Sequence, residues 1–361
     1  MSSGAPAIGG AVLLTGATGT IGTPLLSALA VRGVEEVFAL THVQPLPGGT
    51  PRVQSVAGDV TAGADLGLTA RDADRIRATV TGIVHAAADT RFTAPIDQAR
   101  AVNTEGMRHV LAFARRCRRL ERFLALSTTH VAGRRTGEVF EHELEHDAGF
   151  VNAYEASKYD AERELRARAG DLPVSVCRLS TVIGDSRTGD IPRRGAIHQA
   201  VLFMYASLVP MVPGTEESPI DLVALDYAVE AIAWLATRGF TPGRTWQLCS
   251  GAETIAAGEL LDLTLTAFAD YRPAFVDLAT FELFRRSGDL VGDAALRAST
   301  EGIANFAPQL AYPKRFDTTG CAAALAGASI EAPPIRDAWR NVVRRLVQSP
   351  GALDEGADDA A

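Results

Sequence analysis

The sequence lacks several features that mark specialised classes of protein. Lysine and arginine total 35 against 43 aspartate and glutamate residues, which gives a net charge of −8. Without a basic excess there is no general attraction to nucleic-acid phosphates, and this argues against DNA or RNA binding. No two of the four cysteines form a Cys-x-x-Cys pair, which excludes zinc ribbons and thioredoxin-type redox motifs. Their scatter is typical of buried thiols in a reducing compartment.

Long hydrophobic runs are also missing. The most apolar stretch, Val201–Val212, is too short to cross a bilayer and contains Pro210. Residues 1–10 have no basic segment followed by an apolar core, so they do not read as a signal peptide. We therefore expect a cytoplasmic protein without a membrane span. Residues 1–10 are expected to be flexible, and the acidic, Gly/Ala-rich residues 346–361 are expected to be disordered.

Short apolar runs alternate with helical patterns through the first 190 residues. The predicted strands are Ala11–Thr15, Val37–Thr41, Val53–Ala57, Ile83–Ala86, Phe123–Ser127 and Val174–Leu179. The predicted helices are Thr23–Arg32, Ala70–Thr79, Ala101–Arg116 and Ala153–Ala169. This alternation predicts an α/β fold, a doubly wound parallel sheet with helices on both faces.

The alternation fades after residue 190 and returns briefly at a predicted helix, Asp226–Thr237, and a strand, Thr245–Leu248. We therefore assign residues 11–190 and 225–250 to a dinucleotide-binding domain. Residues 191–224 and 251–345 are expected to form a smaller, mostly helical substrate-binding portion.

A glycine-rich turn follows the first predicted strand. Gly16, Gly19 and Gly22 lie between this strand and a helix that begins near Pro24. Glycines permit a tight turn and let backbone N–H groups approach a pyrophosphate at the helix N-terminus. The position of the motif, more than its spacing, favours a dinucleotide site over a turn without a ligand.

The end of the second strand bears on the choice of dinucleotide. Sites that prefer NAD usually place an acid there to bind the ribose 2′-hydroxyl, but this strand ends in Thr41 and His42. A histidine can accept the 2′-phosphate of NADPH, so NADPH is favoured modestly and NADH stays possible. The alternative is that His42 is an ordinary exposed loop residue.

Tyr154 and Lys158 stand four residues apart in a strong helical pattern, which places them on one face. A nearby ammonium is expected to lower the pKa of the phenol, so that tyrosine can exchange a proton with a carbonyl-derived oxygen. Thr128 follows the strand Phe123–Ser127, where strand ends of such sheets face the ligand crevice. By itself the Tyr/Lys pair also fits an ordinary surface pair, and the hydroxyl also fits a bond within a turn.

Three other patterns have plainer explanations. His142-Glu-Leu-Glu-His146 matches a zinc-protease string, but it falls in a predicted loop, so we expect no metal. The basic run Arg115–Arg122 is either a solvated helix end or a docking patch for an acidic carrier or a coenzyme A phosphate. Val201–Val212 is either core or the lining of an acyl pocket.

Taken together, these motifs resemble the extended short-chain dehydrogenase/reductase superfamily over about residues 11–250, which implies a Rossmann sheet and an NAD(P)-dependent oxidoreductase. The resemblance implies that Tyr154 and Lys158 are the acid/base pair and that Thr128 holds the reacting oxygen. It implies that Asn103 organises the lysine. The implied cofactor-binding residues are Gly16, Thr18, Gly19, Thr20, Ile21, Gly22, His42, Asp59, Val60, Ala86, Ala87, Ala88, Asn103, Tyr154, Lys158, Leu179, Ser180 and Val182.

Within that superfamily the chain looks like the thioester reductase and fatty acyl-CoA reductase branch, on the segments after Gly58-Asp59, at His85–Ala88 and at Gly184–Gly189. The resemblance implies NADPH-dependent reduction of an acyl thioester to an aldehyde or alcohol, with a possible acyl carrier protein in trans, by a monomer or homodimer. His42 stands where this branch often has arginine, and Leu179 replaces a usual proline. The alternatives are a ketone or aldehyde reductase, an NAD-dependent sugar-nucleotide epimerase or dehydratase, and a nucleotide-sensing scaffold.

Overall fold

A central parallel sheet organises the chain in the computed structural model, which describes residues 10–42, 46, 52–268, 271–291 and 307–348. Its seven strands run in the order β12-β7-β5-β4-β1-β2-β3. They are β1 (Ala11–Thr15), β2 (Glu36–Thr41), β3 (Val53–Ala57), β4 (Val80–His85), β5 (Arg122–Thr128), β7 (Val174–Leu179) and β12 (Thr245–Leu248). This order confirms the predicted α/β class and its doubly wound Rossmann sheet.

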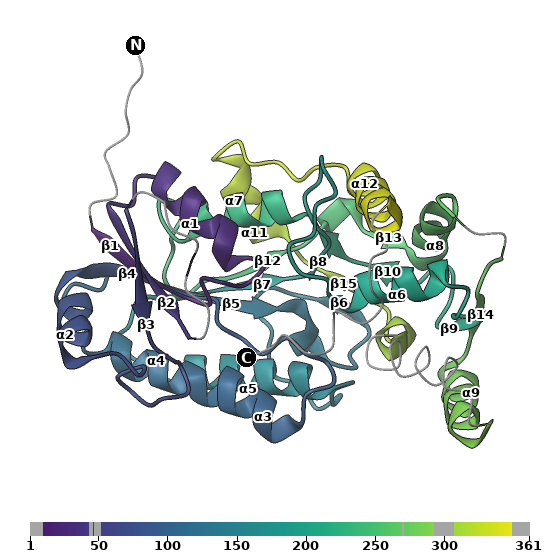
Figure 1. Cartoon of the computed structure of the whole chain (residues 1–361), viewed down its shortest axis with the longest axis horizontal. Helices are drawn as coiled ribbons and strands as arrows, with labels where there is room; N and C mark the ends of the chain where they lie inside the picture. The colour runs from purple at the N-terminus through teal and green to yellow at the C-terminus, as the bar shows by residue number, and fades with distance from the viewer. Residues whose placement is uncertain (1–9, 43–45, 47–51, 269–270, 292–306, 349–361) are drawn as a thin grey trace, which may run out of the picture.

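Helices cover both faces of the sheet (Figure 1). One face carries α1 (Gly22–Val31), α7 (Leu225–Leu235) and α11 (Thr319–Ala326), and the other carries α2 (Ala70–Thr79), α4 (Gly106–Ala114) and α5 (Ala153–Arg168). Side chains of β1 alternate between the two cores: Val12 and Leu14 enter one, and Leu13 enters the other. Burial on both faces explains why these strands are almost continuously apolar.

The helix that leads into α4 differs from its predicted form. It begins earlier, as α3 (Ile96–Arg100), and passes through a π-helical turn, η1 (Ala101–Glu105), before α4. Pro95 stands at the N-cap of α3, a start signal that the periodicity alone did not reveal. The helix α5, in contrast, begins where predicted, because the side chain of Asn152 caps it by accepting from the N–H of Glu155.

The rest of the described chain consists of short elements. Four two-stranded parallel or antiparallel pairs join β6 (Gly137–Val139) to β15 (Lys314–Phe316), β8 (Thr181–Val182) to β11 (Leu222–Val223), β9 (Met211–Pro213) to β14 (Ala274–Val276), and β10 (Pro219–Ile220) to β13 (Ile255–Ala256). The remaining elements are η2 (Thr129–Ala132), α6 (Ala196–Tyr205), η3 (Gly251–Glu253), α8 (Ala257–Leu265), α9 (Leu278–Val291), η4 (Ala307–Ala311) and α12 (Ile335–Gln348). Apart from η2, these helices fall in the part of the chain that was predicted to be mostly helical, whereas the short strand pairs were not predicted.

The ends of the chain were expected to be flexible or disordered. Residues 1–9 and 349–361 lie outside the described part of the chain, whereas α12 continues through Gln348. Among the helices of the described residues, none combines the length and the apolar character needed to cross a bilayer.

Candidate active site

The turn between β1 and α1 is so tight that only glycine fits at two of its positions. Gly16 has a φ of +70°, and a Cβ atom there would lie 2.5 Å from the amide nitrogen of Ala87. A Cβ atom on Gly22 would lie 2.0 Å from the carbonyl oxygen of Gly16. Bare backbone therefore reaches the first turn of α1, whose N–H groups attract anions, so the turn fits a pyrophosphate. The other predicted residues of the turn are half-buried or exposed: Thr18, Gly19, Thr20 and Ile21.

A second contact holds this turn against the segment after β4. The hydroxyl oxygen of Thr15 accepts hydrogen bonds from the N–H groups of Ala86 and Ala87, each at 3.2 Å. It also lies 2.8 Å from Nδ1 of the buried His85. Burial, aided by the charge of Lys158, lowers the pKa of His85 to about 3, so this ring is neutral and structural. Three predicted cofactor-lining residues are half-buried in the segment: Ala86, Ala87 and Ala88.

The ends of β2 and β3 bring His42 and Asp59 together. Nε2 of His42 lies 3.5 Å from Oδ2 of Asp59, with the two side chains 59% and 27% exposed. Asp59 also accepts hydrogen bonds from the N–H and hydroxyl of Thr61, each at 2.7 Å. Val60 is buried next to it. The sequence showed no acid at the end of β2, but the fold supplies one from the neighbouring strand.

Asn103 connects the segment after β4 to α5. Its side-chain oxygen accepts from the N–H of Asp89 at 2.8 Å, and its Nδ2 donates to the Asp89 carbonyl oxygen at 2.9 Å. Nδ2 also donates to Oγ of Ser157 at 2.9 Å. We expected Asn103 to organise Lys158, and the hydrogen bonds of its side chain reach Ser157, the residue directly before that lysine. The contact with Ser157 ties Asn103 to the helix that carries Lys158.

Thr128, Tyr154 and Lys158 meet where β5 ends and α5 begins. All three are buried, and the side chains of Thr128 and Tyr154 share a hydrogen bond. Nζ of Lys158 donates to the carbonyl oxygen of Leu126 at 2.9 Å. The structure thus brings together the hydroxyl, phenol and ammonium that the motif spacing predicted at the carboxyl edge of the sheet.

The protonation of this trio differs from the expectation. Burial raises the pKa of Tyr154 to about 12, and the hydrogen bond from Thr128 opposes that shift only in part. Burial also lowers the pKa of Lys158 to about 8, against the attraction of Glu162. The predicted lowering of the phenol pKa is therefore wrong for this structure, because the effect of burial outweighs that of the hydrogen bond with Thr128. Tyr154 stays protonated at neutral pH and is suited to give a proton.

Two rings that the sequence did not single out form a wall beside Tyr154. Phe92 stacks on the phenol ring with a centroid distance of 5.4 Å and an angle of 28°. His130 presents its edge to Tyr154 at 6.4 Å and to Phe92 at 5.9 Å. These contacts restrict the directions from which a substrate can approach the phenol.

A buried ion pair lies one helical turn beyond Lys158. Nη2 and Nε of Arg178, on β7, donate to the carboxylate of Glu162, on α5, at 2.6 and 3.0 Å, and both side chains are 1% exposed. Ser127 donates its hydroxyl hydrogen to the same carboxylate at 3.0 Å. The four-residue step from Lys158 to Glu162 was visible in the sequence as a helix-face pattern, but the partner on β7 was not. This pair fixes the helix that carries the phenol and the ammonium.

Residues from the far end of the chain also reach this region. The side-chain amide of Gln309, on η4, donates to the carboxylate of Glu155 and hydrogen-bonds with His130. Burial raises the pKa of Glu155 to about 7, and burial lowers that of Lys314, on β15, to about 8. A segment far from Tyr154 in the sequence therefore contributes contacts beside it, since Gln309 and Glu155 are 154 residues apart.

The remaining predicted cofactor residues lie at the end of β7 and directly after it. Leu179 and Ser180 are buried, and the N–H of Ser180 donates to the carbonyl oxygen of Leu248 at 3.2 Å. Val182 is half-buried in β8. They lie at the same carboxyl edge as Thr128, because β5 and β7 are parallel neighbours with Thr128 opposite Leu179.

The zinc-protease string does not form a cluster of ligands. Nε2 of His146 lies 2.8 Å from the carbonyl oxygen of Val131, and His142 stacks on Phe140. Glu143 pairs with Arg135 at 2.6 Å. Across the residues that the structure describes, no group of three or more metal-ligating side chains comes together.

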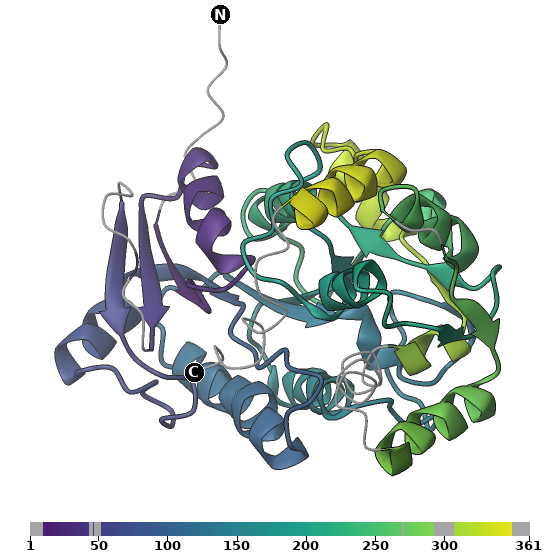
Figure 2. The same cartoon turned by 45° about the vertical axis from the view of Figure 1, so that its right-hand side comes forward.

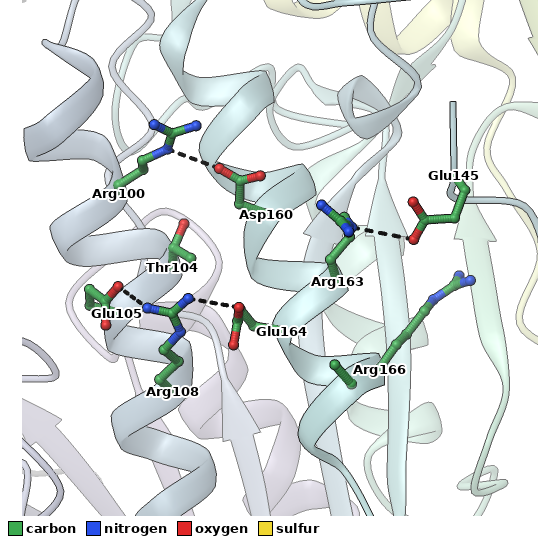
Figure 3. A pocket seen from close by; sticks show the side chains of 10 residues that line it. Arg100, Thr104, Glu105, Arg108, Glu145, Asp160, Arg163, Glu164 and Arg166 are labelled. Carbon is green, nitrogen blue, oxygen red and sulfur yellow. Dashed lines mark hydrogen bonds and ion pairs between the residues drawn. The ribbon is translucent and has the colours of Figure 1, made fainter. Parts of the chain in front are cut away.

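A large cavity lies elsewhere, between α3, α4 and α5 (Figure 3). Its arginines are paired within the chain: Arg100 with Asp160 at 2.9 Å, Arg108 with Glu164 at 2.7 Å, and Arg163 with Glu145 at 3.4 Å. Since its charges are already neutralised and none of the predicted residues lines it, this cavity is not the candidate site.

Comparisons with known proteins agree with this geometry. A family model described as male sterility protein matches residues 49–232. The PKS-NRPS hybrid synthetase cheA of Chaetomium globosum is 30% identical over 241 residues, which are 61% of this chain and 5% of that protein. The chloroplastic fatty acyl-CoA reductase 2 of Arabidopsis thaliana is 36% identical over 104 residues, which are 29% of this chain and 15% of that protein.

A solved structure shares the fold over nearly the whole chain. The terminal R domain from the myxalamid PKS-NRPS biosynthetic pathway superposes with a TM-score of 0.81, at 24% identity, covering 96% of this chain and 93% of that one. The chain thus spans a small fraction of the two curated relatives and almost all of this domain.

Proposed function

The chain belongs to the male sterility protein family, and on that premise we propose that it is an NADPH-dependent reductase of acyl thioesters. The reaction converts a thioester, NADPH and a proton to an aldehyde, a thiol and NADP. A carrier protein in trans or coenzyme A would present the acyl group. The names of the two relatives, a fatty acyl-CoA reductase and a PKS-NRPS synthetase, support this substrate class.

The observation that carries the proposal is the hydrogen-bonded pair of Thr128 and Tyr154, with Lys158 one turn later on the same helix. Two hydroxyl groups at one point can hold a single carbonyl oxygen, where negative charge develops during reduction. A carbonyl carbon held there would lie at the edge of the sheet at which the glycine turn fits a dinucleotide.

Each side chain then has a definite task. The nicotinamide, when bound, supplies the hydride. Thr128 and Tyr154 donate hydrogen bonds to the substrate oxygen, and the protonated phenol gives it a proton. The resulting hemithioacetal loses that proton as its C–S bond breaks, and the sulfur leaves as a thiol. Lys158, held on the carbonyl of Leu126, keeps a positive charge near the phenol.

The cofactor assignment is part of the proposal. Gly16, Gly19 and Gly22 would hold the pyrophosphate, and His42 would accept the 2′-phosphate that distinguishes NADPH. Asp59 and Val60 would border the adenine, and Leu179, Ser180 and Val182 the nicotinamide. In the same proposal residues 11–190 and 225–250 bind the nucleotide, and residues 191–224 and 251–345 bind the substrate.

The proposal is tested by the oxidation of NADPH and NADH with a panel of acyl thioesters, aldehydes and ketones. We expect turnover of thioesters with NADPH. Tyr154→Phe should lower kcat by about 10²- to 10⁴-fold, the usual contribution of a positioned acid. Tyr159→Phe is the matched control, because Tyr159 is on the same helix and its hydroxyl donates to Glu145 at 2.9 Å, outside the trio.

Different results would contradict different parts of the proposal. Turnover of ketones alone would remove the thioester assignment. A strong preference for NADH, unchanged in His42→Ala, would remove the NADPH assignment. Equal activity of Tyr154→Phe and Tyr159→Phe would remove the catalytic trio.

A further inference from the structure

Five exposed arginines stand on two segments that pack against each other, the loop after β8 and α12. We call them the arginine patch: Arg187, Arg193, Arg340, Arg344 and Arg345. The loop is pressed onto the helix, since Nδ2 of Asn341 donates to the carbonyl oxygen of Ser186 at 2.9 Å. A Cβ atom on Gly189 would lie 2.3 Å from the Asn341 carbonyl oxygen. Because this junction is close-packed, the arginines of both segments share one surface.

Among the described residues, only part of this charge is neutralised by ion pairs. Arg345 pairs with Asp190 at 2.9 Å, and Arg340 pairs with Asp337 at 2.7 Å. Among the described residues, no ion pair is formed by Arg187, Arg193 or Arg344. Five arginines face three aspartates, including Asp185 beside Arg187, on a chain whose net charge is −8. The patch is thus a local reversal of the overall charge.

Only a short length of chain separates the patch from the proposed site. Val182, a proposed nicotinamide contact, precedes Arg187 by five residues, a length of chain that spans at most about 18 Å. The loop begins beyond the carboxyl end of β7, the edge that also carries Thr128. In Figure 2, α12 lies beside α6, in agreement with their packing through a shared apolar cluster.

The other basic segment, Arg115–Arg122, lies at the opposite edge. It joins the end of α4 to the start of β5, and the strand carries the chain roughly 20 Å from Arg122 to Thr128. Arg116 pairs with Asp65 at 2.8 Å, and Arg115 donates to the carbonyl oxygen of Arg168. A thioester presented there would face the packed sheet instead of the phenol, so this run does not fit the docking role considered from sequence.

Resting on the proposed function, we propose that the arginine patch is the docking surface for an acidic acyl carrier protein. An acidic partner is repelled by most of a chain with net charge −8 and attracted by this patch, which steers it toward the site. The carrier would sit on α12 and the loop after β8, with its thioester arm entering past Val182 toward Tyr154.

The test compares two double charge reversals in the full chain. Arg187→Glu/Arg344→Glu changes the patch, and Arg118→Glu/Arg119→Glu makes the same change in charge at two exposed arginines of the opposite edge. Each protein is assayed with octanoyl-pantetheine, octanoyl-coenzyme A and an octanoyl group on a recombinant acidic carrier protein. We expect the patch variant to lose on the order of tenfold in kcat/KM with the carrier substrate only. The loss should shrink as salt is raised.

The outcomes separate this inference from the proposed function. If the unmodified chain does not reduce octanoyl-pantetheine, the thioester activity and the docking surface both fall. If it does, but the patch variant keeps its kcat/KM with the carrier or loses no more than the opposite-edge variant, the docking surface alone is refuted. An equal loss with octanoyl-coenzyme A would assign the patch to the nucleotide phosphates of that thioester, and would also refute carrier docking.

Discussion

Replacing the buried carboxylate of Glu162 is the most informative perturbation outside the catalytic trio. Its carboxylate accepts two hydrogen bonds from Arg178, and both side chains are 1% exposed, so solvent cannot compensate for a lost partner. Removing one member of a buried ion pair costs about 3–5 kcal/mol, because the other charge stays buried without a counter-charge. We therefore expect Glu162→Gln to lower the free energy of unfolding by about that amount.

The free energy of unfolding is measured by urea denaturation. The slope of that free energy against urea concentration should be the same for all variants. Arg178→Met and the double variant complete a thermodynamic cycle, and the double variant should cost about 0.5–3 kcal/mol less than the sum of the single ones. Arg166→Met is the control, because Arg166 contacts the same carboxylate at 3.0 Å but is 36% exposed. Its loss should cost about 1 kcal/mol or less.

The same variant reports on Lys158. The charge of Glu162 raises the pKa of that ammonium, which burial holds near 8. If the protonated lysine is required, activity falls as pH rises through this pKa, and Glu162→Gln should move the fall to lower pH. If the losses of the two single variants simply added up in the double variant, and the fall of activity at high pH did not move in Glu162→Gln, both the energetic and the electrostatic reasoning would be refuted.

Three further predictions concern the turn, the linking amide and the C-terminal segment. Gly16→Ala should abolish measurable NADPH binding by fluorescence, because a Cβ atom would lie 2.5 Å from the Ala87 nitrogen; unchanged affinity would show that the turn does not approach the nucleotide. Asn103→Ala should lower kcat more than it changes KM and destabilise by about 1–3 kcal/mol, because buried partners at Asp89 and Ser157 lose their bonds; a change in KM alone would speak against positioning of α5. For Glu155→Gln, the pKa of the native carboxyl is raised from 4.5 to about 7, so the wild type loses stability as pH rises through this range and the variant does not. Between pH 5 and 7.5 the free energy of unfolding of the variant should therefore rise relative to that of the wild type by up to about 3 kcal/mol, with a matching relative rise in melting temperature. A difference in melting temperature that stays the same over this pH range would contradict the titration of a buried carboxyl.

The central sheet was predictable because each strand is buried on both faces. Ala11–Thr15, Val53–Ala57 and Val174–Leu179 have the predicted bounds, since a short apolar run between turn residues has few other solutions in an alternating chain. The small strand pairs were not predictable. A ladder of two or three residues, such as β8 with β11, has no periodicity to detect and depends on the surrounding packing.

The same division applies to the site. Local spacing in the sequence was enough to predict Gly16, Tyr154 and Lys158 as site residues. The contacts of Glu155 with Gln309 and of His42 with Asp59 arise only when separate segments of the chain meet in the fold. The direction of the Tyr154 pKa shift was also missed, because burial is a property of the whole fold and not of the four-residue step to Lys158.

The π-helical turn Ala101–Glu105 gives this site an unusual dependence on chain length. A wide turn holds one residue more than a regular helix would need, and such turns often occur at functional positions. Deleting one of its residues would restore an unbroken ladder between α3 and α4 with little rotation of the flanking helices, but it would remove the wide turn on which Asn103 stands. The shortened helix would be more regular, but the local backbone that presents the Asn103 amide to Asp89 and Ser157 would be lost, and these hydrogen bonds with it.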